Sequence, residues 1–231
     1  MQQRALRPAI DTQGFELWRD GLSSETVGDL IGAIEAAGAK DGVYGLRNLL
    51  RRSTRVREVA AALRALVEPT LGAGAFPTRA LLFDKLPRAN WLVGWHQDLT
   101  IAVRARVDLE GFRAWTIKGG VPHVQPPVSI LENMLTLRLH LDCADAENGA
   151  LIVLPGTHAM GRLPDDWAVA ADAEKRAVVC AAEAGDILAF RPLLLHMSRK
   201  SAKPSHRRVI QIEYTASPLP PPLAWHESTD V

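Results

Sequence analysis

The stretch Asp145-Ala146-Glu147-Asn148-Gly149 is a polar turn between two apolar runs. Residues 129–142 before it are rich in leucine, and residues 150–154 after it are entirely apolar. Asn-Gly between two such runs is a strong hairpin signal. We therefore predict a strand over 129–142 and a returning strand over 150–154, which makes β-structure the basis of the fold.

Short apolar runs of the same kind occur along most of the chain beyond residue 76. Glycine, proline and small polar residues divide them, as expected for short strands. Residues 164–176 are an exception, for which we predict one short helix. The predicted strands are 80–86, followed by a turn at 87–90, then the segment around His96, and 177–181, 186–190, 193–198 and 208–215.

The first third of the chain has helical periodicity instead. Apolar residues from Val27 to Ile34 recur at helical spacing, and Ser23 or Ser24 is the expected N-cap. A similar run predicts a second helix over residues 53–67. Helices first and many short strands afterwards favour a mainly β fold with flanking α, a β-sandwich or jelly roll with the N-terminal helices packed outside.

The length of 231 residues suits one domain with a sizeable core. We divide it into a largely helical part (1–75), a jelly-roll core (76–215) and a proline-rich surface tail (216–231). Within the core, residues 104–127 have little periodicity and contain several glycines and prolines. A long irregular insertion of this kind is typical of a lid or binding loop.

Composition excludes some classes of function. The net charge is +1, so we expect neither a nucleic-acid-binding nor a membrane-binding surface. No stretch approaches the roughly 18 apolar residues of a membrane span, and residues 1–15 contain no apolar leader. Two cysteines, Cys143 and Cys180, suit buried reduced thiols and not a disulfide framework. We expect a cytoplasmic protein.

Trp95-His96-Gln97-Asp98 carries the first sign of chemistry. Side chains two residues apart on a strand point to the same face, so His96 and Asp98 can bind one metal ion together. One imidazole and one carboxylate are two-thirds of the facial site that holds non-haem Fe(II) with open coordination positions. A distant histidine would complete this site.

We predict His196 as the third ligand, because it follows the apolar run Leu193-Leu194-Leu195, which reads as a buried strand. The same spacing recurs in His140 and Asp142, but there the aspartate begins a turn, where it is common for structural reasons. The alternative without chemistry is that His96 and Asp98 are a surface pair. The other histidines considered are His123, His140, His158, His206 and His226.

Arginine near the distal histidine is the expected anchor for a dicarboxylate co-substrate, because its planar guanidinium binds carboxylates in a bidentate manner. Arg207 and Arg208 open the last predicted strand, and alternation allows only one of them to face inward. The residues alone leave both open, together with the alternative of a solvated basic turn.

Three elements of the chain together resemble the phytanoyl-CoA dioxygenase family. They are the His96 to Asp98 element, the run from Glu147-Asn148-Gly149 to Leu154-Pro155-Gly156-Thr157-His158, and His196-Met197-Ser198 with Arg207. The similarity extends over residues 14–214. It implies a double-stranded β-helix (a cupin-like jelly roll) and an Fe(II)/2-oxoglutarate-dependent dioxygenase that uses O2 and releases succinate and CO2.

The resemblance also implies roles for single residues. His96, Asp98 and His196 would bind the iron, which decides against His140 and Asp142. Asp98 stands where halogenating relatives have a small residue, so hydroxylation or a related oxidation is implied. The co-substrate residues would be Arg207 for the distal carboxylate, Ser198 beside it and, as a weaker match, Lys85.

The substrate is expected to be a small molecule that the sequence does not identify. Arg138, on one face of its predicted strand with Thr136 and His140, is a candidate for an anionic substrate group, and an edge salt bridge is the alternative. The insertion offers Trp115, Lys118, His123 and Gln125 without a ranking. Two other functions stay open: a cupin-like metal enzyme that does not use 2-oxoglutarate, and a non-catalytic metal-binding barrel.

Overall fold

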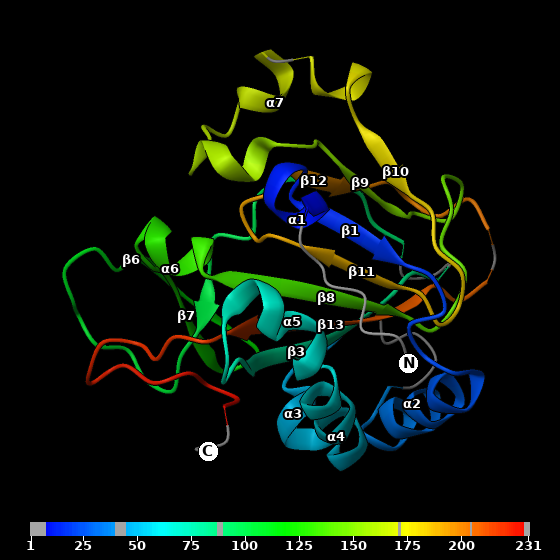
Figure 1. The fold of residues 1–231 in the computed structure, drawn as a ribbon, viewed down its shortest axis with the longest axis horizontal. Coiled ribbons are helices and arrows are strands. Elements are labelled where there is room, and N and C mark those ends of the chain that lie inside the picture. Colours follow the sequence, from blue (N-terminus) through cyan, green and yellow to red (C-terminus); the bar gives the residue numbers. More distant parts are fainter. Residues whose placement is uncertain (1–7, 40–44, 87–89, 171, 204, 229–231) are drawn as a thin grey trace.

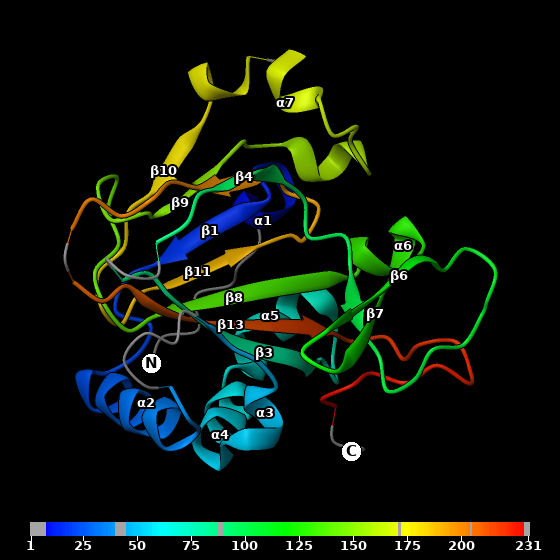
Figure 2. The same ribbon diagram turned by 180° about the vertical axis from the view of Figure 1, so that it is seen from behind.

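Two antiparallel sheets face each other in the computed structural model, which describes residues 8–39, 45–86, 90–170, 172–203 and 205–228 (Figures 1 and 2). The large sheet has the order β1 (Phe15–Trp18), β11 (Ile187–Phe190), β8 (Met134–His140), β13 (Arg208–Thr215), β3 (Phe76–Asp84), β2 (Gly45–Leu46). The small sheet has the order β10 (Val178–Cys180), β9 (Leu151–Val153), β12 (His196–Ser198), β4 (Val93–His96). This arrangement confirms the predicted mainly β, jelly-roll fold.

Alternation along the central strand β8 creates two different faces. Leu135, Leu137 and Leu139 belong to the core cluster that the large sheet shares with the helices. Thr136, Arg138 and His140 alternate with these leucines and are buried on the opposite, inner face. The inner face of the large sheet is therefore partly polar, and it is this face that meets the small sheet.

The helices α1 (Pro8–Thr12), α2 (Ser24–Ala36), α3 (Leu49–Arg52), α4 (Thr54–Ala62) and α5 (Arg64–Leu71) belong to the N-terminal part, and α2 to α5 cover the outer face of the large sheet (Figure 1). Ser23 caps α2 as predicted by accepting a hydrogen bond from the Thr26 amide. The second predicted helix is two helices, because the chain breaks at Leu63, which keeps right-handed helical dihedral angles. The apolar residues therefore keep their helical spacing across Leu63, and the sequence does not show where the first helix ends and the second begins.

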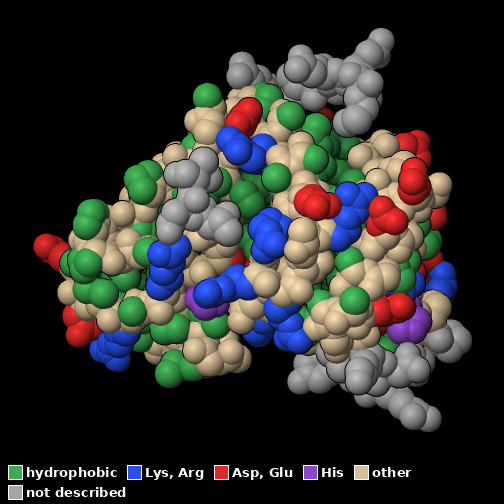
Figure 3. All heavy atoms as spheres, turned by 90° about the horizontal axis from the view of Figure 1, so that it is seen from below, with side chains coloured by type: hydrophobic (Ala, Val, Ile, Leu, Met, Phe, Trp, Pro, Cys, Tyr) green, Lys and Arg blue, Asp and Glu red, His purple; other side chains and the backbone are tan. Residues whose placement is uncertain are grey.

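The N-terminal part also supplies strands to the large sheet, which the helical prediction missed. β1 pairs with β11, and β2 pairs with β3. Figure 3 views the molecule from the side of α2 to α4 and shows basic and acidic side chains interspersed with hydrophobic ones. This mixture agrees with the net charge of +1.

The insertion 104–127 is more regular than predicted. β6 (Arg113–Lys118) and β7 (Val121–Gln125) form a hairpin, and β7 also pairs with β5 (Ile101–Ala102). Its turn is Gly119-Gly120, whose φ values of 58° and 79° match the left-handed conformations that tight hairpin turns require. The prediction of an irregular segment was wrong because the two glycines were read as loop composition and not as a turn.

The region around β8 differs from the prediction at both ends. Residues 128–132 form a short helix, α6 (Val128–Glu132), so the strand begins only at Met134. β9 does not return beside β8; it pairs with β10 and β12 in the small sheet. The Asn148-Gly149 turn therefore carries the chain from one sheet to the other, and the predicted hairpin was wrong.

The remaining helical segments are short: 3-10 turns at Thr157–Met160 and Ala173–Lys175, and α7 (Trp167–Ala170) within the predicted helix. The predicted surface tail was wrong, because Leu219, Leu223 and Trp225 are buried. The prolines around these residues interrupt any helical or strand periodicity, so the sequence gives no sign that the three side chains are buried. Cys180 is buried as expected, whereas Cys143 is exposed, and both thiols are free.

Across the described ranges no helix has both the length and the apolar character needed to cross a membrane. Residues 1–7, part of the segment 1–15 for which no apolar leader was predicted, lie outside the described residues. Most of the turn predicted at 87–90 lies outside them as well.

Candidate metal centre

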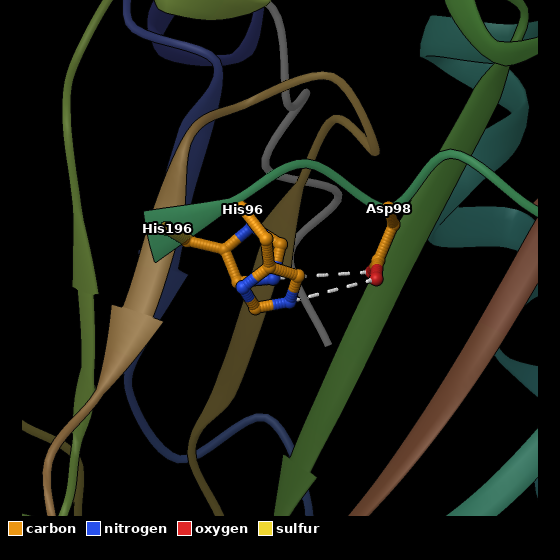
Figure 4. Close-up of side chains that lie close together, drawn as sticks. All are labelled: His96, Asp98 and His196. Carbon is orange, nitrogen blue, oxygen red and sulfur yellow. Dashed lines mark ion pairs between the residues drawn. The ribbon is translucent and has the colours of Figure 1, made fainter. Parts of the chain in front are cut away.

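His96, Asp98 and His196 converge at one point between the sheets (Figure 4). His96 ends β4 and His196 begins β12, and the two residues are direct cross-strand partners with ring centroids 4.1 Å apart. Asp98 follows the end of β4 and was not, as predicted, on the strand itself; its amide donates to the Pro192 carbonyl. Its carboxylate still reaches both rings, at 3.9 Å from His96 Nε2 and 4.0 Å from His196 Nε2.

Backbone carbonyls orient both imidazoles. His96 Nδ1 lies 2.9 Å from the Gly94 carbonyl and His196 Nδ1 lies 2.8 Å from the Leu194 carbonyl. A carbonyl can only accept, so each Nδ1 carries the proton and each Nε2 keeps a free lone pair. Both lone pairs are on the nitrogens that approach Asp98, which is the tautomer that a histidine metal ligand requires.

The electrostatics of the cluster suit a cation. Burial, followed by the charge of His96, lowers the pKa of His196 to about 4 against the opposing effect of Asp98. Burial raises the pKa of Asp98, but His196 and His96 oppose this, and the net pKa is below its usual value. Two imidazoles and one carboxylate on the same side of a site are the donor set of a facial Fe(II) centre.

In the alternative pair, His140 and Asp142, the aspartate is paired with an arginine. Asp142 accepts two side-chain hydrogen bonds of 2.8 Å from Arg208 and a third from the Arg208 amide. His140 is buried with neither ring nitrogen hydrogen-bonded. Among the described residues, His96, Asp98 and His196 are the group of three that could hold a metal ion.

The other histidines lie away from this group. His206 Nδ1 contacts Asp84 at 2.7 Å, and His158 contacts the Asp11 carbonyl at 3.3 Å. His123 is buried on β7 with Nδ1 at 2.9 Å from the Val121 carbonyl. His226 is half-buried in the C-terminal segment.

A cavity of about 150 Å³ adjoins His96, Asp98 and His196. Its walls include the aromatic rings of Phe83 and Trp91 and the polar side chains of Ser198 and Gln211. Four cationic side chains also line it: Arg79, Lys85, Arg138 and Arg207. A cavity with this excess of positive charge is suited to anionic ligands.

Arg207 and Arg208 have different surroundings. Arg207 lines the cavity and is 2% exposed, and its Nε has no hydrogen-bond partner within the described part of the chain. Burial and the nearby Arg138 lower its pKa to about 9, so it remains a cation at neutral pH. Arg208 points to Asp142, as described above, and does not line this cavity.

Lys85 and Ser198 are joined to each other beside Arg207. Lys85 Nζ donates to Ser198 Oγ at 2.7 Å, to the Ser198 carbonyl at 3.4 Å and to the Arg199 carbonyl. Ser198 Oγ in turn donates to the Gly149 carbonyl at 2.8 Å. All three ammonium protons are therefore used within the protein. Burial, followed by the charges of Arg207 and Arg138, lowers the pKa of Lys85 to about 7.

The four candidates from the insertion do not line the cavity. Lys118 donates to Thr100 Oγ1 at 3.2 Å, and Trp115 lies against Arg106. Gln125 lines a separate surface pocket.

Sequence reasoning missed three groups of the inner face: Gln211, Glu213 and Arg79. Gln211 Nε2 donates to Asp98 Oδ2 at 3.4 Å, and Glu213 pairs with Arg79 at 2.8 Å. Polar residues at alternate positions of an otherwise apolar last strand were the available signal.

The model of the phytanoyl-CoA dioxygenase family matches residues 11–209. The chain belongs to the phytanoyl-CoA dioxygenase family. It is accordingly a 2-oxoglutarate-dependent non-haem iron oxygenase, with iron as its cofactor and 2-oxoglutarate as its co-substrate. No curated protein sequence matches the chain.

Solved structures share the fold. SnoK, a non-haem α-ketoglutarate-dependent carbocyclase from nogalamycin biosynthesis, has a TM-score of 0.71 at 17% identity, over 93% of this chain and 84% of that one. EctD from S. alaskensis, solved with 2-oxoglutarate and 5-hydroxyectoine, gives 0.69 at 20% identity, over 90% and 74%. HygX from Streptomyces hygroscopicus, solved with iron, gives 0.65 at 16% identity, over 93% and 88%.

Proposed function

We propose that the protein oxidises an unactivated C–H bond of a small-molecule substrate, with His96, Asp98 and His196 as the iron ligands. The observation that carries this proposal is the convergence of two correctly protonated imidazoles and one carboxylate beside a cavity that also contains Arg207. When bound, iron with 2-oxoglutarate and O2 supplies the oxidising power, and succinate and CO2 are the by-products.

The protein's own residues bind and orient. Arg207 holds the distal carboxylate of 2-oxoglutarate, because a buried guanidinium without a protein partner forms strong bidentate bonds to a carboxylate. Gln211 fixes the Asp98 carboxylate through its amide. Lys85 and Ser198 support the same wall; with its protons committed, Lys85 contributes charge and positions the Ser198 hydroxyl.

The proposed outcome is hydroxylation or a related oxidation, and not halogenation. Asp98 occupies the third protein position of the facial set, so the metal has no vacant protein site for a halide.

Anaerobic addition of 2-oxoglutarate to the Fe(II) protein tests the proposal directly. We expect a visible metal-to-ligand charge-transfer band when the co-substrate chelates the iron. Iron binding without this band would contradict the use of 2-oxoglutarate and would favour a cupin-like enzyme of another type. Failure to bind iron at all would favour a non-catalytic barrel.

Arg207→Ala and Arg208→Ala form a matched pair for the carboxylate anchor. Arg207→Ala should weaken 2-oxoglutarate binding at least roughly 30-fold, because it removes one side of a buried charge pair. Arg208→Ala should leave the binding constant unchanged and lower the thermal midpoint, because it removes the ion pairs with Asp142 and Glu35, which lie away from the cavity lining. Titration of the charge-transfer band measures the 2-oxoglutarate affinity of both variants, and a thermal melt measures their stability. Weaker binding in Arg208→Ala but not in Arg207→Ala would assign the role to Arg208.

A further inference from the structure

The guanidinium of Arg138 lines the cavity without an anionic partner. Arg138 lies on β8 opposite Gln211 of β13 and is 6% exposed. Its side chain makes one long hydrogen bond, of 3.5 Å to Gln211 Oε1, and packs over the Phe83 ring at 5.8 Å. Its Nε is buried without a partner, and no ion pair joins it to a carboxylate of the described chain. A buried cation without a counter-ion is energetically unfavourable, so this guanidinium is expected to bind an anionic ligand.

The other cations of the cavity are already balanced or committed. Arg79 forms a buried ion pair with Glu213 at 2.8 Å. Lys85 gives all three protons to Ser198 and to the Arg199 carbonyl. Lys85 therefore has no donor left for a further anion. Arg79 Nε and Nη1 have no hydrogen-bond partner among the described residues, but the charge of Arg79 is already balanced by Glu213.

The proposed function, on which this inference rests, accounts for the remaining charges except one. Arg207 neutralises the distal carboxylate of 2-oxoglutarate. Asp98 and the second carboxylate of the co-substrate would balance the two positive charges of Fe(II) when the metal is bound. Lys85 has no carboxylate partner either, but its three protons are given to Ser198 and to the Arg199 carbonyl. Among the four cations that line the cavity, Arg138 is then the one with neither a counter-charge nor fully committed donors.

We propose that the substrate carries a carboxylate and that Arg138 binds it, which makes Arg138 a specificity-determining residue. A guanidinium binds a carboxylate through two parallel hydrogen bonds, and a cavity of about 150 Å³ suits a compact anion. Gln211 links Arg138 to Asp98 through contacts of 3.5 and 3.4 Å. The carboxylate is therefore held close to the metal, and the oxidised carbon is close to the carboxylate in the substrate.

Acetate and its neutral analogue acetamide probe this site without knowledge of the substrate. Each is titrated into the anaerobic Fe(II) protein saturated with 2-oxoglutarate, and the change in the charge-transfer band is recorded. The proteins are wild type, Arg138→Gln and Arg55→Gln; Arg55 is a surface arginine that pairs with Asp29. We expect acetate but not acetamide to perturb the band in wild type and Arg55→Gln, and Arg138→Gln to need at least about 30-fold more acetate.

The affinity for 2-oxoglutarate separates the two sources of a carboxylate. Arg138→Gln should bind 2-oxoglutarate within about twofold of wild type. A loss as large as that of Arg207→Ala would assign Arg138 to the co-substrate and overturn the inference, while the proposed function would stand. Equal responses to acetate and acetamide in wild type would also overturn it. Absence of the band in wild type would instead overturn the proposed function.

Arg138→Lys provides a second variant if Arg138→Gln does not fold. It keeps the charge but loses the bidentate geometry, so we expect an intermediate affinity for acetate. Succinate release is then measured over small molecules supplied as pairs of carboxylic acid and amide. Turnover confined to acids supports the inference, and equal turnover of acids and amides overturns it.

Discussion

Asp98 and Asp142 each lie two residues beyond a histidine, yet their carboxylates have different partners. Asp98 faces two imidazoles and the Gln211 amide, whereas Asp142 accepts the Arg208 guanidinium. The spacing alone therefore does not identify a metal ligand. The residue on the neighbouring strand adds the missing information, because His196 lies opposite His96 and brings a second imidazole to Asp98.

This difference predicts opposite results for two matched substitutions. Asp98→Ala should weaken iron binding more than roughly 100-fold, since losses of that order follow even from changes in the groups that support metal ligands. Asp142→Ala should bind iron normally and unfold at a lower temperature, because the Arg208 guanidinium loses its Asp142 partner. Iron content after desalting and a thermal melt measure the two effects. Loss of iron in Asp142→Ala would instead indicate that His140 and Asp142 bind the metal.

His140 predicts how stability depends on pH. Burial, together with the charges of Arg138 and Arg207, lowers its pKa to about 3, well below the value near 6.5 of an unfolded chain. The unfolded state thus binds more protons, so stability is complete above about pH 6.5 and is lost as pH falls. Between pH 7.5 and 5 this residue alone should lower the unfolding free energy by about 2 kcal/mol.

His140→Leu tests that assignment, because leucine keeps the buried volume and cannot titrate. Urea denaturation at pH 5, 6 and 7.5 should give a shallower dependence for the variant than for wild type. Parallel curves would show that other groups carry the acid sensitivity.

At the scale of elements, Gly149 shows why a turn between sheets needs glycine. Its φ is +80°, and a Cβ at this position would lie 2.7 Å from the Arg199 carbonyl and 3.1 Å from Lys85 Nζ. A side chain here would therefore meet both an unfavourable backbone conformation and the hydrogen bonds of Lys85.

Gly149→Ala and Gly28→Ala should have effects of opposite sign. Gly149→Ala should lower the unfolding free energy by roughly 1–3 kcal/mol through strain and overpacking. Gly28 is exposed within α2 with nothing near its Cβ position, so alanine there should stabilise by roughly 0.5–1 kcal/mol. Urea unfolding measures both, and a neutral Gly149→Ala would show that the turn can rearrange.

Periodicity predicted elements whose buried positions recur at regular spacing, and it failed where the outcome depends on a contact far along the chain. α2 and β13 were predicted closely, since their apolar faces alternate regularly. The destination of β9 could not be predicted, because an Asn-Gly turn reads the same whether the chain returns to its own sheet or crosses to another. Likewise, the choice between Arg207 and Arg208 depends on Asp142, a contact made across 66 residues.

At the scale of the whole molecule, the C-terminal segment ties the helical layer to the large sheet. The buried Glu227 carboxylate accepts the Leu50 amide at 2.9 Å and the Ala80 amide at 3.1 Å. Glu227→Ala should cost roughly 2–4 kcal/mol, because it leaves two buried amides without acceptors. Glu58→Ala, on the exposed face of α4, is the control. An unchanged denaturation midpoint for Glu227→Ala would mean that this tie does not support the fold.

The cross-strand pairing of His96 with His196 has a consequence for the kinetics of metal uptake. The ladder between β4 and β12 sets the separation of the two rings during folding, and the Gly94 and Leu194 carbonyls set their tautomers. The entropy of ordering these ligands is thus spent before an ion arrives. Iron should therefore enter in a single phase whose rate is proportional to its concentration, limited by loss of water from the ion and not by movement of the chain.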